Sequence, residues 1–360
     1  MNHATRDTES GQGSEPCMCL CGKTPFAGVA EDKNQPVHAR SHRAMATVFA
    51  VYVAGESADR ARACFDEVSE EIDRIEQTFS RFRPMSELSR INRLAAAQPV
   101  VTDPEVFQLL TTALEISRRT AGIFDITVGP LTRAWGFANR QGHVPSSEEL
   151  NAAMAVTGWE NVVLDPEWRT VAFRRPGVEL DLGAIAKGYA VDRVLELLRR
   201  ADVCGAVDAG SSSMAATETH TGAQGWRVSV PHPADRRRAV SEIELGDRAL
   251  STSGTREQSF EAGGKSYSHL IDPRNASATV AWQQVTVLAP TSTLADALSS
   301  AMHVLGPDEG STVLAQMDAC AALWVREADD GTECRDYRWP GRICCGNDKE
   351  SKGTWTDANS

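Results

Sequence analysis

The chain has 360 residues, 41% hydrophobic and 24% charged, so it can bury a sizeable core in one large domain or two lobes. Its formal charge of -12 excludes a protein that binds nucleic acid or anionic lipid through a broad basic surface, which needs clustered Lys and Arg. There is no apolar run long enough for a membrane span and no secretory signal pattern. We therefore expect a cytoplasmic protein, or an exported or membrane-associated one if the start site is misassigned.

The two ends of the chain differ in composition from its middle. Residues 1–38 and 329–360 are rich in small polar and charged side chains without periodicity, which predicts mobile tails around a folded unit of residues 39–328. A C-x-C-x-C run begins at Cys17 but lacks the paired spacing of zinc modules, so we favour no metal there, with a soft metal ion as the alternative. Three isolated cysteines in apolar stretches are expected in the core: Cys64, Cys204 and Cys320.

The first part of the folded unit is predicted to be mainly helical. Apolar side chains recur every three or four residues, and the helix ends carry recognisable signals, such as the Ser146 and Glu149 capping box. In chain order we expect a strand at 47–53, then helices from Ala61 to Phe79, from Pro104 to Gly122, and after Ser146.

From Asn161 onward short strands dominate. They are expected at 162–164, 170–174, 178–182, 203–208, 226–230, 241–245, 267–271 and 285–289, with helices at 186–200, 294–305 and 308–317. A helix-rich part followed by a strand-rich part predicts an α+β fold rather than a regularly alternating α/β sheet. No strand is followed by a G-x-G-x-x-G or G-x-x-x-x-G-K-[ST] motif, which argues against a dinucleotide-dependent oxidoreductase of the common type.

The stretch DLGAIAKGYAVD at residues 181–192 is the clearest candidate for phosphate binding. It runs from a predicted strand through small residues into an amphipathic helix. Gly183 and Ala184 allow the backbone to approach a ligand, the amides at the helix start point outward, and Lys187 adds a positive charge. An ordinary strand-to-helix turn with a solvated lysine explains the same pattern, so spacing alone leaves both interpretations open.

Three further features have two interpretations each. Asp296 and Ser300 lie four residues apart on one helix face, where their hard oxygens suit Mg²⁺, although such a pair is more often at the surface or a cap. His269 is either a positioned base or a satisfied core histidine. Loop aromatics between 121 and 137 either stack on a flat ligand or pack on the core: Phe124, Trp135 and Phe137.

Taken together and in this order, these stretches resemble the ApbE family, the FAD:protein FMN transferases. The resemblance extends from Met45 to about Gly306. It is carried by AMATVF at Ala44, FSRFRPMSELSRIN at Phe79, the stretch from Gly122 to Phe137, DLGAIAKGYAVD, STSG at Ser251, YSHLIDPR at Tyr267 and ADALSSAMHVLG at Ala295.

The resemblance implies a two-lobed α+β fold with mixed or antiparallel sheets and flanking helices, and with FAD between the lobes. It also implies Mg²⁺-dependent transfer of the FMN part of FAD to a Thr or Ser hydroxyl of a target flavoprotein. The product is a phosphoester, and AMP is released. The implied partners are FAD and an acceptor protein, with no nucleic acid and no membrane span.

The same resemblance implies roles for individual residues. Asp296, Ser300 and the backbone oxygen of Ala184 would bind the metal ion. His269 would help deprotonate the attacking hydroxyl, and Lys187 would neutralise phosphate charge. The residues implied to hold the FAD are Met45, Phe82, Ile123, Phe124, Asp125, Asp181, Lys187 and Ile271.

Four positions depart from the family pattern. Ser300 stands where Thr is usual, and loses the methyl group that restrains the hydroxyl rotamer. Ala46 replaces the Gly of M-G-T, and Ala276 replaces a Gly after DPRN. The usual G-G-D reads Gly210, Ser211 and Ser212, which removes a carboxylate and a flexible residue.

Two other functions are consistent with the same implied FAD, metal and base residues. A metal-dependent FAD pyrophosphatase would use water in place of the protein hydroxyl and would give free FMN and AMP. A flavin-binding protein without turnover is expected only if the Ser300 and Ser212 changes abolish the metal site. We favour the transferase because none of the four departures affects Asp296, Lys187 or His269, on which phosphoryl transfer would depend.

Overall fold

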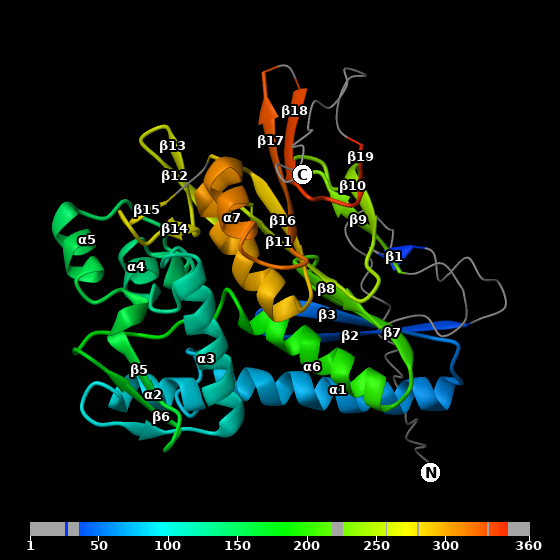
Figure 1. The fold of residues 1–360 in the computed structure, drawn as a ribbon, viewed down its shortest axis with the longest axis horizontal. Coiled ribbons are helices and arrows are strands. Elements are labelled where there is room, and N and C mark those ends of the chain that lie inside the picture. Colours follow the sequence, from blue (N-terminus) through cyan, green and yellow to red (C-terminus); the bar gives the residue numbers. More distant parts are fainter. Residues whose placement is uncertain are drawn as a thin grey trace, which may run out of the picture.

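An eight-stranded antiparallel sheet forms the centre of the computed structural model, which describes residues 26–27, 36–217, 226–256, 258–278, 281–329 and 331–344 (Figure 1). The strand order is β18-β17-β16-β11-β8-β7-β3-β2. The strands span Val37–Ala44 (β2), Thr47–Ala54 (β3), Cys204–Ala209 (β7), Ser213–Ala216 (β8), Ala249–Gly254 (β11), Gln284–Ala289 (β16), Ala321–Ala328 (β17) and Gly331–Tyr337 (β18).

Both faces of this sheet are buried. Because side chains alternate along a strand, Phe49, Val51 and Val53 of β3 face one core while Ala50 and Tyr52 face the other. The first core lies under α1 (Ala58–Phe79), α6 (Ala186–Arg200) and α7 (Ser292–Leu314). The second lies under a small sheet of β1 (Phe26–Ala27), β9 (Arg227–Pro231), β10 (Ala239–Glu244) and β19 (Arg342–Ile343).

A second lobe, built mostly from the helical part of the chain, lies beside the sheet and helix layers (Figure 1). It contains α2 (Glu87–Leu94), α3 (Pro104–Arg119), α4 (Gly129–Ala134), α5 (Ser147–Met154) and a three-stranded sheet of β4 (Val100–Val101), β6 (Thr170–Phe173) and β5 (Val162–Asp165). Two short hairpins adjoin it: β12 (Ser259–Ala262) with β13 (Lys265–Ser268), and β14 (Ile271–Asp272) with β15 (Ser277–Ala278).

The predicted α+β class is confirmed, and several elements match closely. Helix α6 has the predicted bounds, and the Ser146 and Glu149 capping box forms as expected before α5. The two helices predicted at 294–305 and 308–317 are the two helical segments of α7, which are separated at Gly306, where the backbone leaves the helical region before Pro307. None of the helices formed by the described residues has the length and apolar character needed to cross a bilayer.

The strand predicted at 178–182 does not form. Leu180 donates its amide hydrogen to Asn92 Oδ1 at 2.8 Å, and Asp181 donates to the Ile126 carbonyl at 2.7 Å. These single bonds go to two different segments, so the apolar run is extended but belongs to no ladder. The apolar pattern alone does not distinguish a strand paired in a ladder from an unpaired extended segment.

Regular structure continues past the predicted limit at 328. Strand β18 pairs with β17 from Gly331 to Tyr337, and β19 pairs with β10. The predicted C-terminal tail at 329–360 therefore needs correction over the described residues 331–344. Its polar composition is that of an exposed edge strand, which is stabilised by backbone pairing rather than by apolar burial. Strand β2 likewise begins at Val37, two residues before the predicted start of the folded unit.

The predicted core cysteines are buried or half-buried and carry free thiols, whereas the Cys17 to Cys21 run lies outside the described residues. Burial raises the pKa of the Cys320 thiol to about 11, which makes it a poor nucleophile. Cys64 and Cys204 also have raised pKa values, because burial disfavours the thiolate. The interpretation of these three cysteines as apolar core residues is consistent with that environment.

Three departures from glycine in the resembled pattern keep a left-handed backbone, with φ of 58° at Ala46, 59° at Ser211 and 59° at Ala276. Side chains other than Gly cost about 1–2 kcal/mol in this conformation. Because Ala46 is exposed, we expect Ala46→Gly to raise the free energy of unfolding by about 1 kcal/mol, measured by chemical denaturation.

The matched control is Ala152→Gly in helix α5, where an exposed alanine has helical geometry. That change is expected to lower the free energy of unfolding by about 1 kcal/mol. Equal losses in the two variants would show that the Ala46 turn is not strained.

Candidate functional site

Helices α6 and α7 approach closely at Gly188. A Cβ atom added there would lie 2.2 Å from the Ser292 carbonyl oxygen and 2.8 Å from Asp296 Cβ, so only glycine allows this packing. The Gly188 amide donates a hydrogen bond of 2.9 Å to Asp296 Oδ2. The close helix contact therefore fixes one oxygen of the Asp296 carboxylate.

The structure brings Lys187 and Asp296 together, although 109 positions separate them along the chain. Lys187 Nζ lies 3.7 Å from Asp296 Oδ1, and Ser251 Oγ donates to the same oxygen at 3.3 Å. Asp296 is 3% exposed, so its charge is held in a largely dry environment. Lys187 also donates to the Gly183 carbonyl at 3.4 Å, which places its ammonium group over the loop that begins α6.

Ser300 lies one turn after Asp296 on the same side of α7. Its hydroxyl contacts Ser253 Oγ at 3.2 Å, and Ser253 Oγ contacts Ser299 Oγ at 2.8 Å. Ala184 is partly buried in the loop before α6 and packs against the core. Asp296 and Ser300 offer hard oxygens one turn apart on α7.

An arginine that the sequence argument did not single out braces the loop before α6. Arg81 Nε lies 3.2 Å from Asp181 Oδ2, while Arg81 Nη1 lies 3.3 Å from Glu179 Oε1. Asp181 Oδ1 accepts the Gly183 amide hydrogen at 2.9 Å. Asp181 therefore shapes the turn that precedes Lys187. Arg81 lies in the FSRF stretch that carries the resemblance, and that stretch could have indicated it as a site residue.

The aromatic neighbour Phe82 is 70% exposed, with the Arg81 guanidinium 4.5 Å from its ring centroid. An exposed ring beside a half-buried salt-bridge cluster is a suitable surface for stacking a flat ligand. Met45 lies in the β2–β3 turn, partly buried, and its amide donates to Glu76 Oε1 at 3.0 Å.

The other expected flavin residues on the 121–137 loop are buried. Ile123 and Phe124 are 6% and 3% exposed and belong to the first core. Asp125 accepts hydrogen bonds from the Thr127 amide and hydroxyl, both at 2.7 Å, and from the Trp159 amide at 2.9 Å. Burial raises the pKa of Asp125 to about 6. This carboxylate holds the loop in shape.

The loop aromatics pack in a cluster with the β12–β13 hairpin, as the core interpretation expected. Trp135 and Phe137 are buried, and Trp135 Nε1 donates to the Ala276 carbonyl at 2.8 Å. The Trp135 ring centroid lies 5.1 Å from that of Tyr267. Ile271 of β14 is buried in the same cluster.

His269 follows β13 at the edge of this cluster and is partly buried. Its Nδ1 lies 3.1 Å from the Gln258 carbonyl oxygen, and the Phe137 ring packs edge-on at 6.4 Å between centroids. Because a carbonyl only accepts, Nδ1 carries the proton, and the neutral ring has its lone pair on Nε2. That tautomer suits a general base.

His303 on α7 is a residue that the sequence argument missed. It is fully buried, and neither ring nitrogen makes a hydrogen bond of normal geometry with the described residues. Burial and the nearby His269 lower the pKa of His303 to about 3, with the Trp282 carbonyl partly opposing the shift. His303 is therefore neutral at physiological pH.

The ApbE family model matches residues 45–324, well over half of the 360-residue chain. The chain belongs to the ApbE family. A relative from Vibrio cholerae, named FAD:protein FMN transferase, is 34% identical over 272 residues, which cover 74% of this chain and 80% of the relative. A relative of the same name from Escherichia coli is 27% identical over 293 residues, covering 80% and 84%.

Solved structures of ApbE proteins share the fold. The Thermotoga maritima ApbE protein superposes with a TM-score of 0.74 at 30% identity, covering 81% of this chain and 94% of that protein. The apo form of the Pseudomonas stutzeri flavinyl transferase ApbE gives a TM-score of 0.74 at 28% identity, covering 84% and 95%. The predicted ApbE-like fold is confirmed.

The departures from the ApbE pattern around G-G-D leave an ordered turn. Ser211 donates its amide hydrogen to Asp208 Oδ1 at 2.6 Å, and Ser212 donates its hydroxyl to the Ala209 carbonyl at 2.9 Å. Burial raises the pKa of Asp208 to about 7. Gly210 is retained where a Cβ would lie 2.0 Å from Thr47 Oγ1, so the position that sterically requires glycine keeps it.

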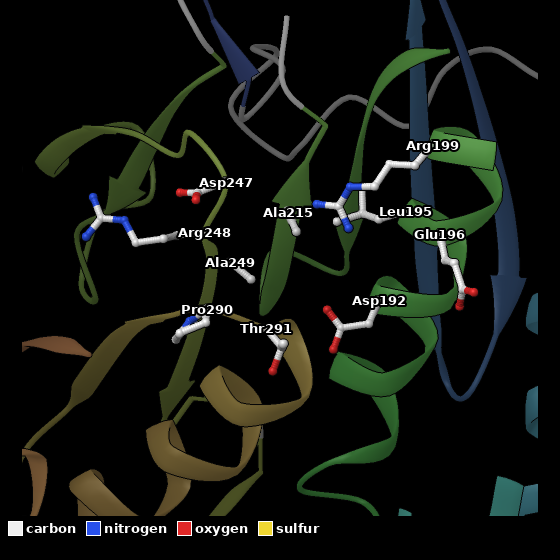
Figure 2. Close-up of a pocket in the computed structure, with 10 residues that line it drawn as sticks. All are labelled: Asp192, Leu195, Glu196, Arg199, Ala215, Asp247, Arg248, Ala249, Pro290 and Thr291. Atoms are coloured by element: carbon white, nitrogen blue, oxygen red, sulfur yellow. The ribbon is translucent and has the colours of Figure 1, made fainter. Parts of the chain in front are cut away.

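A cleft of about 300 Å³ lies between the later part of α6 and the start of α7, and it contains none of the expected ApbE site residues (Figure 2). Asp192 points toward Thr291 and accepts the Ser292 and Thr293 amide hydrogens at 2.7 and 2.8 Å. Arg199 extends into the open space (Figure 2). The Asp192 carboxylate therefore anchors the first turn of α7, one turn away from Asp296.

Proposed function

We propose that this protein transfers the FMN part of FAD to a Thr or Ser hydroxyl of an acceptor flavoprotein, forming a phosphoester and releasing AMP. The observation that carries the proposal is the contact between Lys187 and Asp296 where α6 crosses α7, with Ser300 one helix turn further along α7. The relatives named FAD:protein FMN transferase support the same reaction.

The donor set fits Mg²⁺. No group of three or more His, Cys, Asp and Glu side chains gathers in the part of the chain that the structure describes. One buried carboxylate, one hydroxyl and a backbone carbonyl suit Mg²⁺, which keeps several waters and binds substrate phosphates instead of a full protein cage. Asp296, Ser300 and Ala184 would hold the ion. When bound, Mg²⁺ would neutralise charge on the pyrophosphate oxygens.

The chain's own residues would supply the rest of the chemistry. Lys187, beside Asp296, would bind a phosphate oxygen and balance its charge. His269 Nε2 would take the proton of the acceptor hydroxyl as that oxygen bonds to the FMN phosphorus. The bond from this phosphorus to the bridging oxygen breaks at the same time, and AMP leaves with that oxygen.

The flavin contacts remain proposals. Phe82 offers an exposed ring, and the turn that contains Met45 lies beside Glu76, which also pairs with Arg83. Ile123, Phe124, Asp125, Asp181 and Ile271 would act mainly by shaping the walls behind these residues, because their side chains are buried or already bonded. Cytoplasmic location also remains a prediction, to be checked by cell fractionation.

The test is to incubate the purified protein with FAD, Mg²⁺ and a candidate acceptor flavoprotein, and to follow acceptor mass and AMP together. We expect the acceptor to gain the mass of an FMN phosphoester with one AMP released per label, and expect a chelator to stop both. Release of AMP and free FMN without labelling would identify the pyrophosphatase instead. FAD that binds but is not converted would identify a flavin-binding protein.

A further inference from the structure

Strand β11 places two buried serines against helix α7. Ser251 and Ser253 lie two residues apart on β11 and therefore point to the same face of the sheet, the face that α7 covers (Figure 1). Asp296 and Ser300 lie four residues apart on α7. Two residues of a strand span about 6.6 Å, and four residues of a helix span about 6 Å, so the two pairs match in spacing.

The hydroxyl protons around Ser253 have only one consistent order of single bonds. Ser299 donates to the Asp296 carbonyl at 2.9 Å, which uses its only proton. Ser253 must then donate to Ser299, and Ser300 must donate to Ser253. With its proton directed at Ser253, Ser300 keeps its lone pairs available for a cation.

A second relay ends on the carboxylate. Ser251 donates to Asp296 Oδ1 at 3.3 Å, so the 3.1 Å contact between Ser213 and Ser251 requires Ser213 to be the donor. Ser213 and Ser251 are fully buried, where a hydroxyl without a partner is costly. The relay therefore satisfies both hydroxyls and restrains the carboxylate together with the Gly188 amide.

We propose that Ser251 and Ser253 of β11 are positioning residues that orient Asp296 and Ser300 for the metal ion. Partners behind a metal ligand restrict its orientation and commonly change metal affinity when removed. Ser253 has a specific task in this chain: it replaces the rotamer restraint that the methyl group of a threonine would give at position 300. This inference rests on the proposed metal site.

The test measures binding of Mn²⁺, used as a spectroscopic substitute for Mg²⁺, by counting free Mn²⁺ with electron paramagnetic resonance in the presence of FAD. We expect Ser253→Ala to weaken Mn²⁺ binding about tenfold or more. In a Ser300→Thr background the same change is expected to cost less than about threefold, because the threonine methyl restrains the rotamer. Ser251→Ala should weaken binding equally in both backgrounds.

The matched control is Thr252→Val. Thr252 lies between the two serines but faces the other side of the sheet, where its hydroxyl contacts Thr286 Oγ1 at 2.9 Å. Mn²⁺ affinity should stay within about twofold of wild type in this variant, and circular dichroism checks that each variant folds. Wild-type affinity in Ser253→Ala, or an equal loss in both backgrounds, would overturn the positioning role and leave the transferase proposal standing. A wild-type protein that binds no Mn²⁺ would overturn both.

Discussion

Replacing Asp296 by Asn is expected to lower kcat/KM for FMN transfer by at least about a thousandfold. The change keeps the size of the side chain but removes the negative charge that lies beside Lys187 at the crossing of α6 and α7 and that would bind the metal ion. Loss of one preorganised electrostatic group in a dry site commonly costs a factor of this size. Acceptor labelling under saturating FAD and Mg²⁺ measures the effect.

The matched control for Asp296→Asn is Asp192→Asn. Asp192 is a half-buried carboxylate at the same pair of helices, and it accepts two amide hydrogens at the start of α7. If the Asp296 effect arose only from loosening of α7, the two variants would lose activity alike. We expect Asp192→Asn to lower thermal stability while keeping more than about a tenth of the activity. Activity of Asp296→Asn within tenfold of wild type would contradict the metal assignment.

Replacing His269 by Gln is expected to reduce the rate of FMN transfer by about 10²-fold to 10⁴-fold, the usual contribution of a general base. Gln keeps a polar side chain near the Gln258 carbonyl but has no lone-pair nitrogen to take the proton. An imidazole base must be neutral to act, so the wild-type rate should fall on the acidic side of the pH profile. His269→Gln should remove that fall.

His303→Phe separates the two histidines. Because burial lowers the pKa of His303 to about 3, its ring stays neutral across the assay range and cannot produce the acidic limb. An apolar ring in its place removes two buried nitrogens that make no hydrogen bond of normal geometry with the described residues, which is expected to leave stability unchanged or raised. The acidic limb should persist in this variant. Loss of the acidic limb in His303→Phe would show that the general base has been assigned to the wrong histidine.

Local patterns in the sequence determined much of the secondary structure. The bounds of α6, the capping box before α5 and the stop at Gly306 each follow from side chains within a few residues of the feature they specify. Strand β11 was missed because its sequence, ALSTSG, is mostly small and polar, and β17 was missed because a short apolar run does not distinguish a strand from a buried helix segment. Residues 178–182 are not a strand because no neighbouring strand pairs with them, whereas the polar β18 is a strand because it pairs with β17.

The candidate site divides in the same way. Motifs near Lys187, His269 and Asp296 identify the residue types that phosphoryl transfer requires, and their order along the chain indicates the ApbE family. Tertiary structure alone decided that Lys187 meets Asp296 beside Gly188 and that Arg81 holds Asp181. Tertiary structure alone also decided that His303 is buried and that the serines of β11 form their relays. Ser251 and Asp296, for example, lie 45 residues apart in the chain. No local period specifies which hydroxyl faces which carboxylate until the strand and the helix pack together.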